Sequence, residues 1–144
     1  MAWIDFNQIQ DDLVTLIDGG STGAKLVKKE ADERDYAFHN MPLVDVRLTD
    51  ADPEVRAGQD YFAETTFEVQ VTAFDLSDFS EAATLRQSVI TAVVDLIRTN
   101  AKFSASIESS VIGAHSFSSA KDEQSGAFMA AATVQVIVKT FVDA

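Results

Sequence analysis

The chain opens with hydrophobic residues at helical spacing. Apolar side chains recur at steps of three and four residues: Trp3, Phe6, Ile9, Leu13, Leu16 and Ile17. Polar residues, mostly acids and amides, fall between them, which predicts one amphipathic helix. Gly19 and Gly20 follow the last apolar pair, where a left-handed C-terminal cap favours glycine. We therefore expect the helix to end at about Asp18.

A second helix is predicted over Phe79–Thr99. Asp78 and Glu81 form the reciprocal capping pattern of a helix start. A stripe of apolar residues at 3.6-residue spacing then predicts the face that packs on the core. This stripe consists of Ala82, Leu85, Val89, Val93, Leu96 and Ile97, and Ile90 and Val94 widen it.

Alternation of apolar and polar residues predicts a long strand in the middle of the chain. Phe67, Val69 and Val71 alternate with threonine, glutamate and glutamine, so the apolar set lies on one face. Tyr61 and Phe62 extend this strand backwards to about 14 residues, well beyond the usual length of about five or six. Further strands are expected at 23–27, at 43–49 after Pro42, around Ile107, Val111 and Ile112, and at 128–142.

Three polar segments separate these elements. Residues 50–60 contain Pro53, Gly58 and four carboxylates and are predicted to form a loop, and residues 118–126 a polar turn. The charge run at 28–35 is compatible with helix or coil. The order α-β-β-β-α-β-β therefore predicts a single α+β domain over residues 1–144. We expect a mostly antiparallel sheet of four to five strands with two helices packed on it.

Composition supports one folded domain and excludes several functions. The 144 residues are 47% hydrophobic and include ten phenylalanines, for which the core is the default location. A net charge of −12 repels a phosphate backbone, so sequence-specific DNA binding is disfavoured. With no cysteine, the chain has no disulfide or thiolate chemistry. We expect neither a secretory signal nor a membrane span.

Residue patterns that carry chemistry are weak in this chain. His39 and His115 are too far apart in sequence, and too few, for a structural zinc site. Ser118 and Lys121 have the Ser-x-x-Lys spacing of penicillin-recognising acylases, but they fall in a predicted turn rather than on a helix. We therefore expect no catalytic residue, no cofactor and no built metal site.

Four segments together resemble a known family. They are PLVDVRL at 42–48, FEVQVTAFD at 67–75, SEAATLRQSVITAVVDLI at 80–97 and the closing ATVQVIVKTFVDA at 132–144. Their order is similar to that of the tail terminator (tail completion) proteins of long-tailed bacteriophages. These have an N-terminal helix, a strand group with a long central hairpin, a second helix and a C-terminal hairpin. The resemblance covers nearly the whole chain and is a pattern of elements rather than a signature motif.

The resemblance implies a structural virion protein rather than an enzyme. Such a protein forms a hexameric ring on the last ring of the tail tube, stops polymerisation and offers a surface to the head–tail connector. It is assembled in the host cytoplasm and remains in the virion tail, and DNA passes through its lumen without specific binding. The alternatives are another phage connector or tail tube component, or a small-molecule-binding α+β protein or enzyme.

The acidic segment at 50–60 is the candidate interface. Asp50, Asp52, Glu54 and Asp60 cannot all be desolvated at acceptable cost, so we expect this segment to project from the domain. Together with Arg56, these residues are predicted to contribute to a ring interface or to the lumen. The spacing of Asp50, Asp52 and Glu54 also resembles the start of a calcium loop without its glycine and final glutamate, which leaves a weak surface site for a divalent cation as an alternative.

Overall fold

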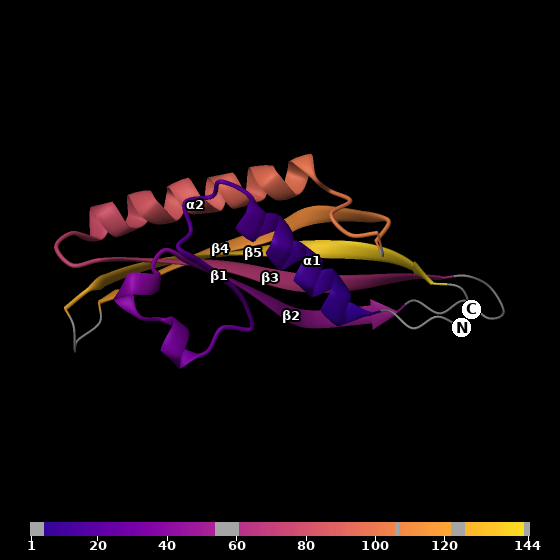
Figure 1. Cartoon of the computed structure of the whole chain (residues 1–144), viewed down its shortest axis with the longest axis horizontal. Coiled ribbons are helices and arrows are strands. Elements are labelled where there is room, and N and C mark those ends of the chain that lie inside the picture. Colours follow the sequence, from indigo (N-terminus) through magenta and orange to yellow (C-terminus); the bar gives the residue numbers. More distant parts are fainter. Residues whose placement is uncertain (1–4, 54–60, 106, 122–125, 143–144) are drawn as a thin grey trace.

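The chain folds in the predicted order α-β-β-β-α-β-β around one sheet (Figure 1). The computed structural model describes residues 5–53, 61–105, 107–121 and 126–142. The helices are α1 (Phe6–Gly19) and α2 (Phe79–Thr99), and two 3₁₀ turns, η1 (Glu33–Asp35) and η2 (Phe38–Asn40), follow the first strand. The strands are β1 (Leu26–Lys29), β2 (Leu43–Pro53), β3 (Tyr61–Asp75), β4 (Ser109–Lys121) and β5 (Phe128–Val142). The predicted α+β fold class is confirmed.

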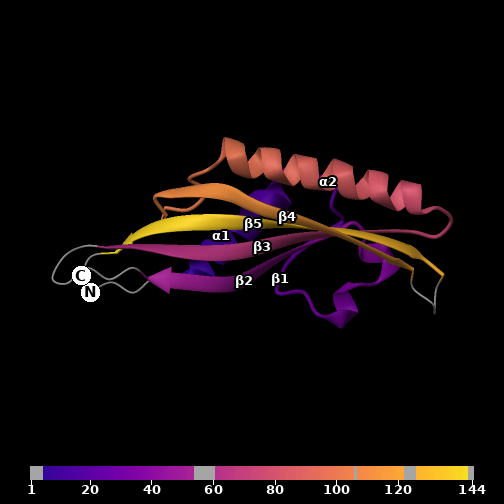
Figure 2. The ribbon, with the colours of Figure 1, turned by 180° about the vertical axis from the view of Figure 1, so that it is seen from behind.

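The five strands lie in the order β1-β2-β3-β5-β4, seen from both sides in Figures 1 and 2. β1 and β2 are parallel, and the other three neighbouring pairs are antiparallel. The central pair, β3 and β5, stays in register from Tyr61 opposite Val142 to Asp75 opposite Phe128. β1 and β4 therefore form the two edges of the sheet, and β2 and β4 run in opposite directions.

Alternation along the central strands places the core between the sheet and both helices. Phe67, Val69 and Val71 on β3 are fully buried, as the period-two pattern predicted. Valines of β5 at paired positions continue the same face, and the apolar stripes of α1 and α2 cover it. The helix residues in this core are Ile9, Leu13, Ile17, Val89, Ile90, Val93, Val94 and Ile97.

The bounds predicted for α2 are confirmed, but two members of its predicted stripe, Leu85 and the half-buried Leu96, are not in the core. Leu85 is 40% exposed, whereas Val89 and Val93 are buried. The N-terminal part of α2 extends beyond α1 (Figure 1). At the helix start, the Asp78 carboxylate accepts a hydrogen bond from the Ser80 amide at 2.9 Å.

Gly20 does not form the left-handed cap that the sequence predicted. α1 ends at Gly19, and Gly20 has a φ of −92°, which any residue can adopt. A Cβ atom at Gly20 would overlap the Cδ2 atom of Leu96 on α2. The glycine therefore leaves room for the Leu96 side chain, which a larger residue would displace, and does not serve a turn conformation.

Two predicted loops are in part strand. β2 runs to Pro53, with a bulge between Leu48 and Asp50, because the long strand β3 gives it a continuous partner. β4 runs to Lys121, so the first part of the predicted polar turn is extended. The charge run at 28–35 forms the end of β1 and the turn η1.

Candidate interaction surface

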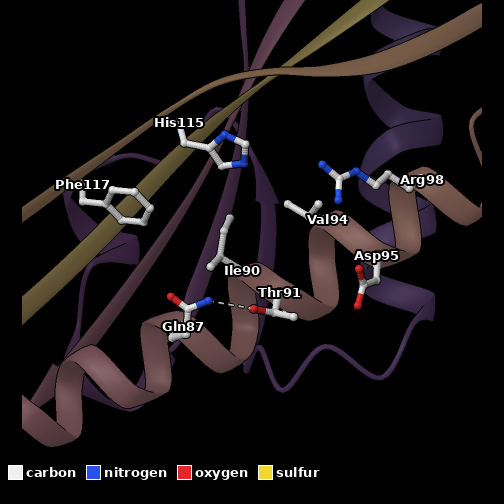
Figure 3. A pocket seen from close by; sticks show the side chains of 8 residues that line it. All are labelled: Gln87, Ile90, Thr91, Val94, Asp95, Arg98, His115 and Phe117. Carbon is white, nitrogen blue, oxygen red and sulfur yellow. Dashed lines mark hydrogen bonds between the residues drawn. The ribbon is translucent and has the colours of Figure 1, made fainter.

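A groove lies between α2 and β4, because α2 packs mainly on β3 and β5 and leaves the edge strand uncovered (Figure 3). Its volume is about 200 Å³. Buried Ile90 and Val94 form its apolar part, and the side chains of His115 and Phe117 face them from β4. Gln87, Thr91, Asp95 and Arg98 complete the lining. The groove therefore combines an apolar floor with a polar rim.

The outer half of β4 is exposed on both faces. All residues from 114 to 121 are exposed, including the Phe117 ring, which is 57% exposed. The sheet has no strand beyond β4 within the described residues. The Arg86 guanidinium of α2 lies over Phe117 at 5.4 Å and donates to the Ser118 carbonyl at 3.3 Å. This edge is a surface at which another strand can add by backbone hydrogen bonds.

The default assignment of phenylalanines to the core is wrong for Phe117. Apart from Phe117, the outer half of its strand, from residue 113 to 121, is composed of small and polar residues on both faces, in contrast to the valine-rich β5. That composition is the signal from which the exposure of β4 could have been predicted, because a strand buried on one face alternates apolar with polar residues.

A second free edge lies on the opposite side of the sheet, along the end of β2. β1 pairs with β2 only from Leu43 to Val46. The Leu48 amide donates to the Glu30 carboxylate at 3.1 Å, and beyond it the described residues provide no neighbouring strand on this side. Leu48 is 37% exposed, and Thr49, Asp50 and Ala51 are exposed.

The predicted acidic interface falls partly on this second edge. Asp50 is exposed and pairs in register with Thr66, and Asp52 pairs with Glu64. Both belong to β2 and not to a loop, which corrects the prediction for residues 50–53. Glu54, Arg56 and Asp60 lie outside the described residues.

Charge is distributed unevenly between the two sides of the sheet. The ion pairs of the described residues lie on the β1–β2 side and are Lys28–Asp35, Lys29–Asp11, Arg34–Asp32 and Arg47–Asp45. By contrast, Arg86, Arg98 and Lys121 on α2 and β4 have no ion pair with a described carboxylate. The rim of the groove carries Arg98 and Asp95, and Arg86 and Lys121 lie outside the groove lining on the same side of the sheet.

A buried polar cluster holds the segment after β1 against the face of the sheet that is opposite the helices. Asp45 is 1% exposed and accepts hydrogen bonds from the Ala31 amide at 2.8 Å and from Arg47 Nε at 2.5 Å. The hydrogen bond from Arg47 to Asp45 raises the pKa of the guanidinium, and burial raises the pKa of the nearby Tyr36 phenol. These groups satisfy one another, so we interpret the cluster as structural.

The structure does not bring the chemically suggestive residues together. His39 lies in η2, far in the chain from His115 in the groove, and the described residues hold no group of three His, Cys, Asp or Glu side chains that could bind a metal ion. Ser118 and Lys121 stand three residues apart on a strand, which places them on opposite faces rather than side by side. Neither described helix has the length and apolar character needed to cross a membrane.

A scan against protein-family models finds no match to this chain, and a search of curated proteins finds no relative.

Proposed function

We propose that this protein is a tail terminator of a long-tailed bacteriophage. It forms a ring on the last ring of the tail tube, ends polymerisation and joins the tail to the head connector. The proposal is supported by the order of elements, by the long β2–β3 hairpin and by a closing strand of 15 residues. In this role the chain is a structural virion protein, and its partners are further copies of itself, the tail tube protein and the connector.

The observation that carries the proposal is the free edge of β4 beside the groove. A strand that exposes Phe117 and has no neighbouring strand on its outer side among the described residues is suited to contact with another protein surface. The opposite edge of the sheet differs in length and charge. Two unlike surfaces favour head-to-tail contacts, which generate rings when the rotation between copies closes.

The net charge of −12 is consistent with the passage of DNA. A tail lumen must let DNA slide without binding it, and an acidic lining repels phosphate within about 8 Å at physiological salt. The groove gives less support to a small-molecule binder. Its volume of about 200 Å³ is below the roughly 300–1,000 Å³ of typical ligand sites.

Electron microscopy of the purified protein tests the proposal. A terminator is expected to form single rings that do not stack into tubes. Long tubes would instead indicate a tail tube protein. Particles of monomer size at all concentrations would contradict ring formation and favour the small-molecule-binding alternative.

A further inference from the structure

We propose that residues 48–51 of β2 in one copy pair with residues 114–117 of β4 in the next copy, with Leu48 seated against Phe117 at the α2–β4 groove; before Leu48 the outer side of β2 is occupied by β1. This inference rests on the proposed function and specifies the contact between copies in the ring. It commits to a second copy of this chain as the occupant of the groove.

The direction of the strands permits this pairing. β2 and β4 run in opposite directions in one copy, because β3 lies antiparallel to β2 and β4 lies antiparallel to β5. Two copies that face the same way therefore bring β4 and β2 together as antiparallel neighbours. The joined sheets keep their helices on the same side.

The exposed apolar side chains of the two edges match. Leu48 projects from β2 toward the helix side of the sheet, since it is paired with the buried Phe67. Phe117 projects to the same side from β4, since it is paired with Ala132. In the joined sheet the two side chains lie on one face, next to the apolar floor formed by Ile90 and Val94. In this arrangement the Leu48 side chain buries part of the exposed Phe117 ring, and the ring buries part of Leu48.

Charge favours contact between these unlike edges over contact between like ones. The end of β2 carries the exposed Asp50, and the exposed Glu64 lies on the neighbouring strand β3. The β4 side carries Arg86, Arg98 and Lys121 without carboxylate partners among the described residues. The acidic side chains project from the face opposite the helices, since Asp50 pairs with Thr66, whereas the cationic side chains lie on the helix side, so the charges supply long-range attraction between unlike edges rather than ion pairs.

The stagger between the two edges is compatible with a closed ring. Leu48 is level with Phe67 on β3, and Phe117 is level with Val71 through Ala132. The offset of four residues is roughly 13 Å, against roughly 19 Å for the width of the four strands β2, β3, β5 and β4. Strands inclined at roughly 35° to the ring axis would absorb this offset, close to the inclination of about 35–45° in closed sheets.

Disulfide trapping between copies tests the contact, because the natural chain contains no cysteine. Leu48→Cys and Phe117→Cys are made as separate variants, mixed and oxidised with copper phenanthroline. We expect covalent dimers in the mixture, in at least tenfold excess over either variant alone. A chain with both substitutions should form a ladder that ends at the size of the ring. Within one chain the two positions are three strand spacings and four residues apart, roughly 20 Å, which is too far for a disulfide.

The matched control replaces Leu76, another exposed leucine, which is 61% exposed and lies after β3, away from both edges. Leu76→Cys mixed with Phe117→Cys should give only background cross-linking. Dimers formed by Phe117→Cys alone would overturn the inference in favour of β4 pairing with β4. Rings in the microscope without a cross-link between positions 48 and 117 would overturn this inference but leave the proposed function standing. Absence of both rings and cross-links would overturn both.

Discussion

Replacing Leu85 and Val93 of α2 by alanine, one at a time, tests whether the sequence stripe or the observed burial decides how much each residue stabilises the fold. Leu85 and Val93 belong to the same predicted stripe, and Leu85→Ala removes three carbons whereas Val93→Ala removes two. The stripe alone therefore predicts a larger loss of stability at Leu85. The structure predicts the reverse order, because Leu85 is 40% exposed and Val93 is fully buried.

The expected loss at Val93 follows from its burial. Withdrawing two buried carbons costs about 1.6 kcal/mol at about 0.8 kcal/mol each. A residual cavity of about 40 Å³ adds about 1 kcal/mol. The higher helix propensity of alanine reduces this loss of stability by about 0.6 kcal/mol. Val93→Ala should therefore lower the free energy of unfolding by about 2 kcal/mol, and Leu85→Ala by no more than about 0.5 kcal/mol.

Urea denaturation followed by circular dichroism measures both values. The midpoint and slope give the free energy of unfolding for each variant and for the natural protein. Two protein concentrations are compared, because assembly of copies raises the apparent stability. A loss at Leu85 equal to or larger than that at Val93 would refute the packing of α2 described above.

Two further predictions concern a charge and a close contact. The hydrogen bond from Lys28 lowers the pKa of Asp35, so its contribution to stability is present above the unfolded pKa of about 3.9 and lost as the pH falls through the folded value. The difference in melting temperature between the natural protein and Asp35→Asn should thus be constant above about pH 5 and shrink as the pH falls below the unfolded pKa of about 3.9; a difference that stays unchanged at acid pH would contradict the ion pair. Gly20→Ala should be stabilising by about 0.4–1 kcal/mol in a Leu96→Ala background and less favourable in the natural one, as measured by urea midpoints. A similar cost in both backgrounds would instead support a left-handed cap at Gly20.

The sequence was most informative for long helices and strands, whose hydrophobic periodicity can be recognised within the element itself. The bounds of α2 and of β5, and the length of β3, follow from hydrophobic periodicity that persists over 15 residues or more. Such long patterns average out local exceptions. The fold class then follows from the order of the elements, because only a few architectures accommodate strands that are grouped between two helices.

The candidate surface could not be found in the same way, because exposure at an edge depends on which strands become neighbours. Nothing in the residues of β3 and β5 specifies that these two strands, separated by α2 and β4 in the chain, pair at the centre of the sheet. Because β3 and β5 pair at the centre, β4 becomes an edge strand that α2 does not cover, and Phe117 is exposed. The same limit applies to Gly20, whose role depends on the position of Leu96 on the other helix. Only the poor alternation of β4 offered a local signal.

In the proposed ring, the two unlike free edges would allow a small domain to assemble and yet stop. The two edges differ in length, in charge and in position along the strands. When each contact joins one edge of each kind, an open row of copies always has one unused β2 edge and one unused β4 edge. Growth then continues until the last copy meets the first, at which point every edge is occupied. A subunit with this property uses its sheet edges only within the ring. The two rims of the ring remain free for unlike partners, as a component placed between tube and connector requires.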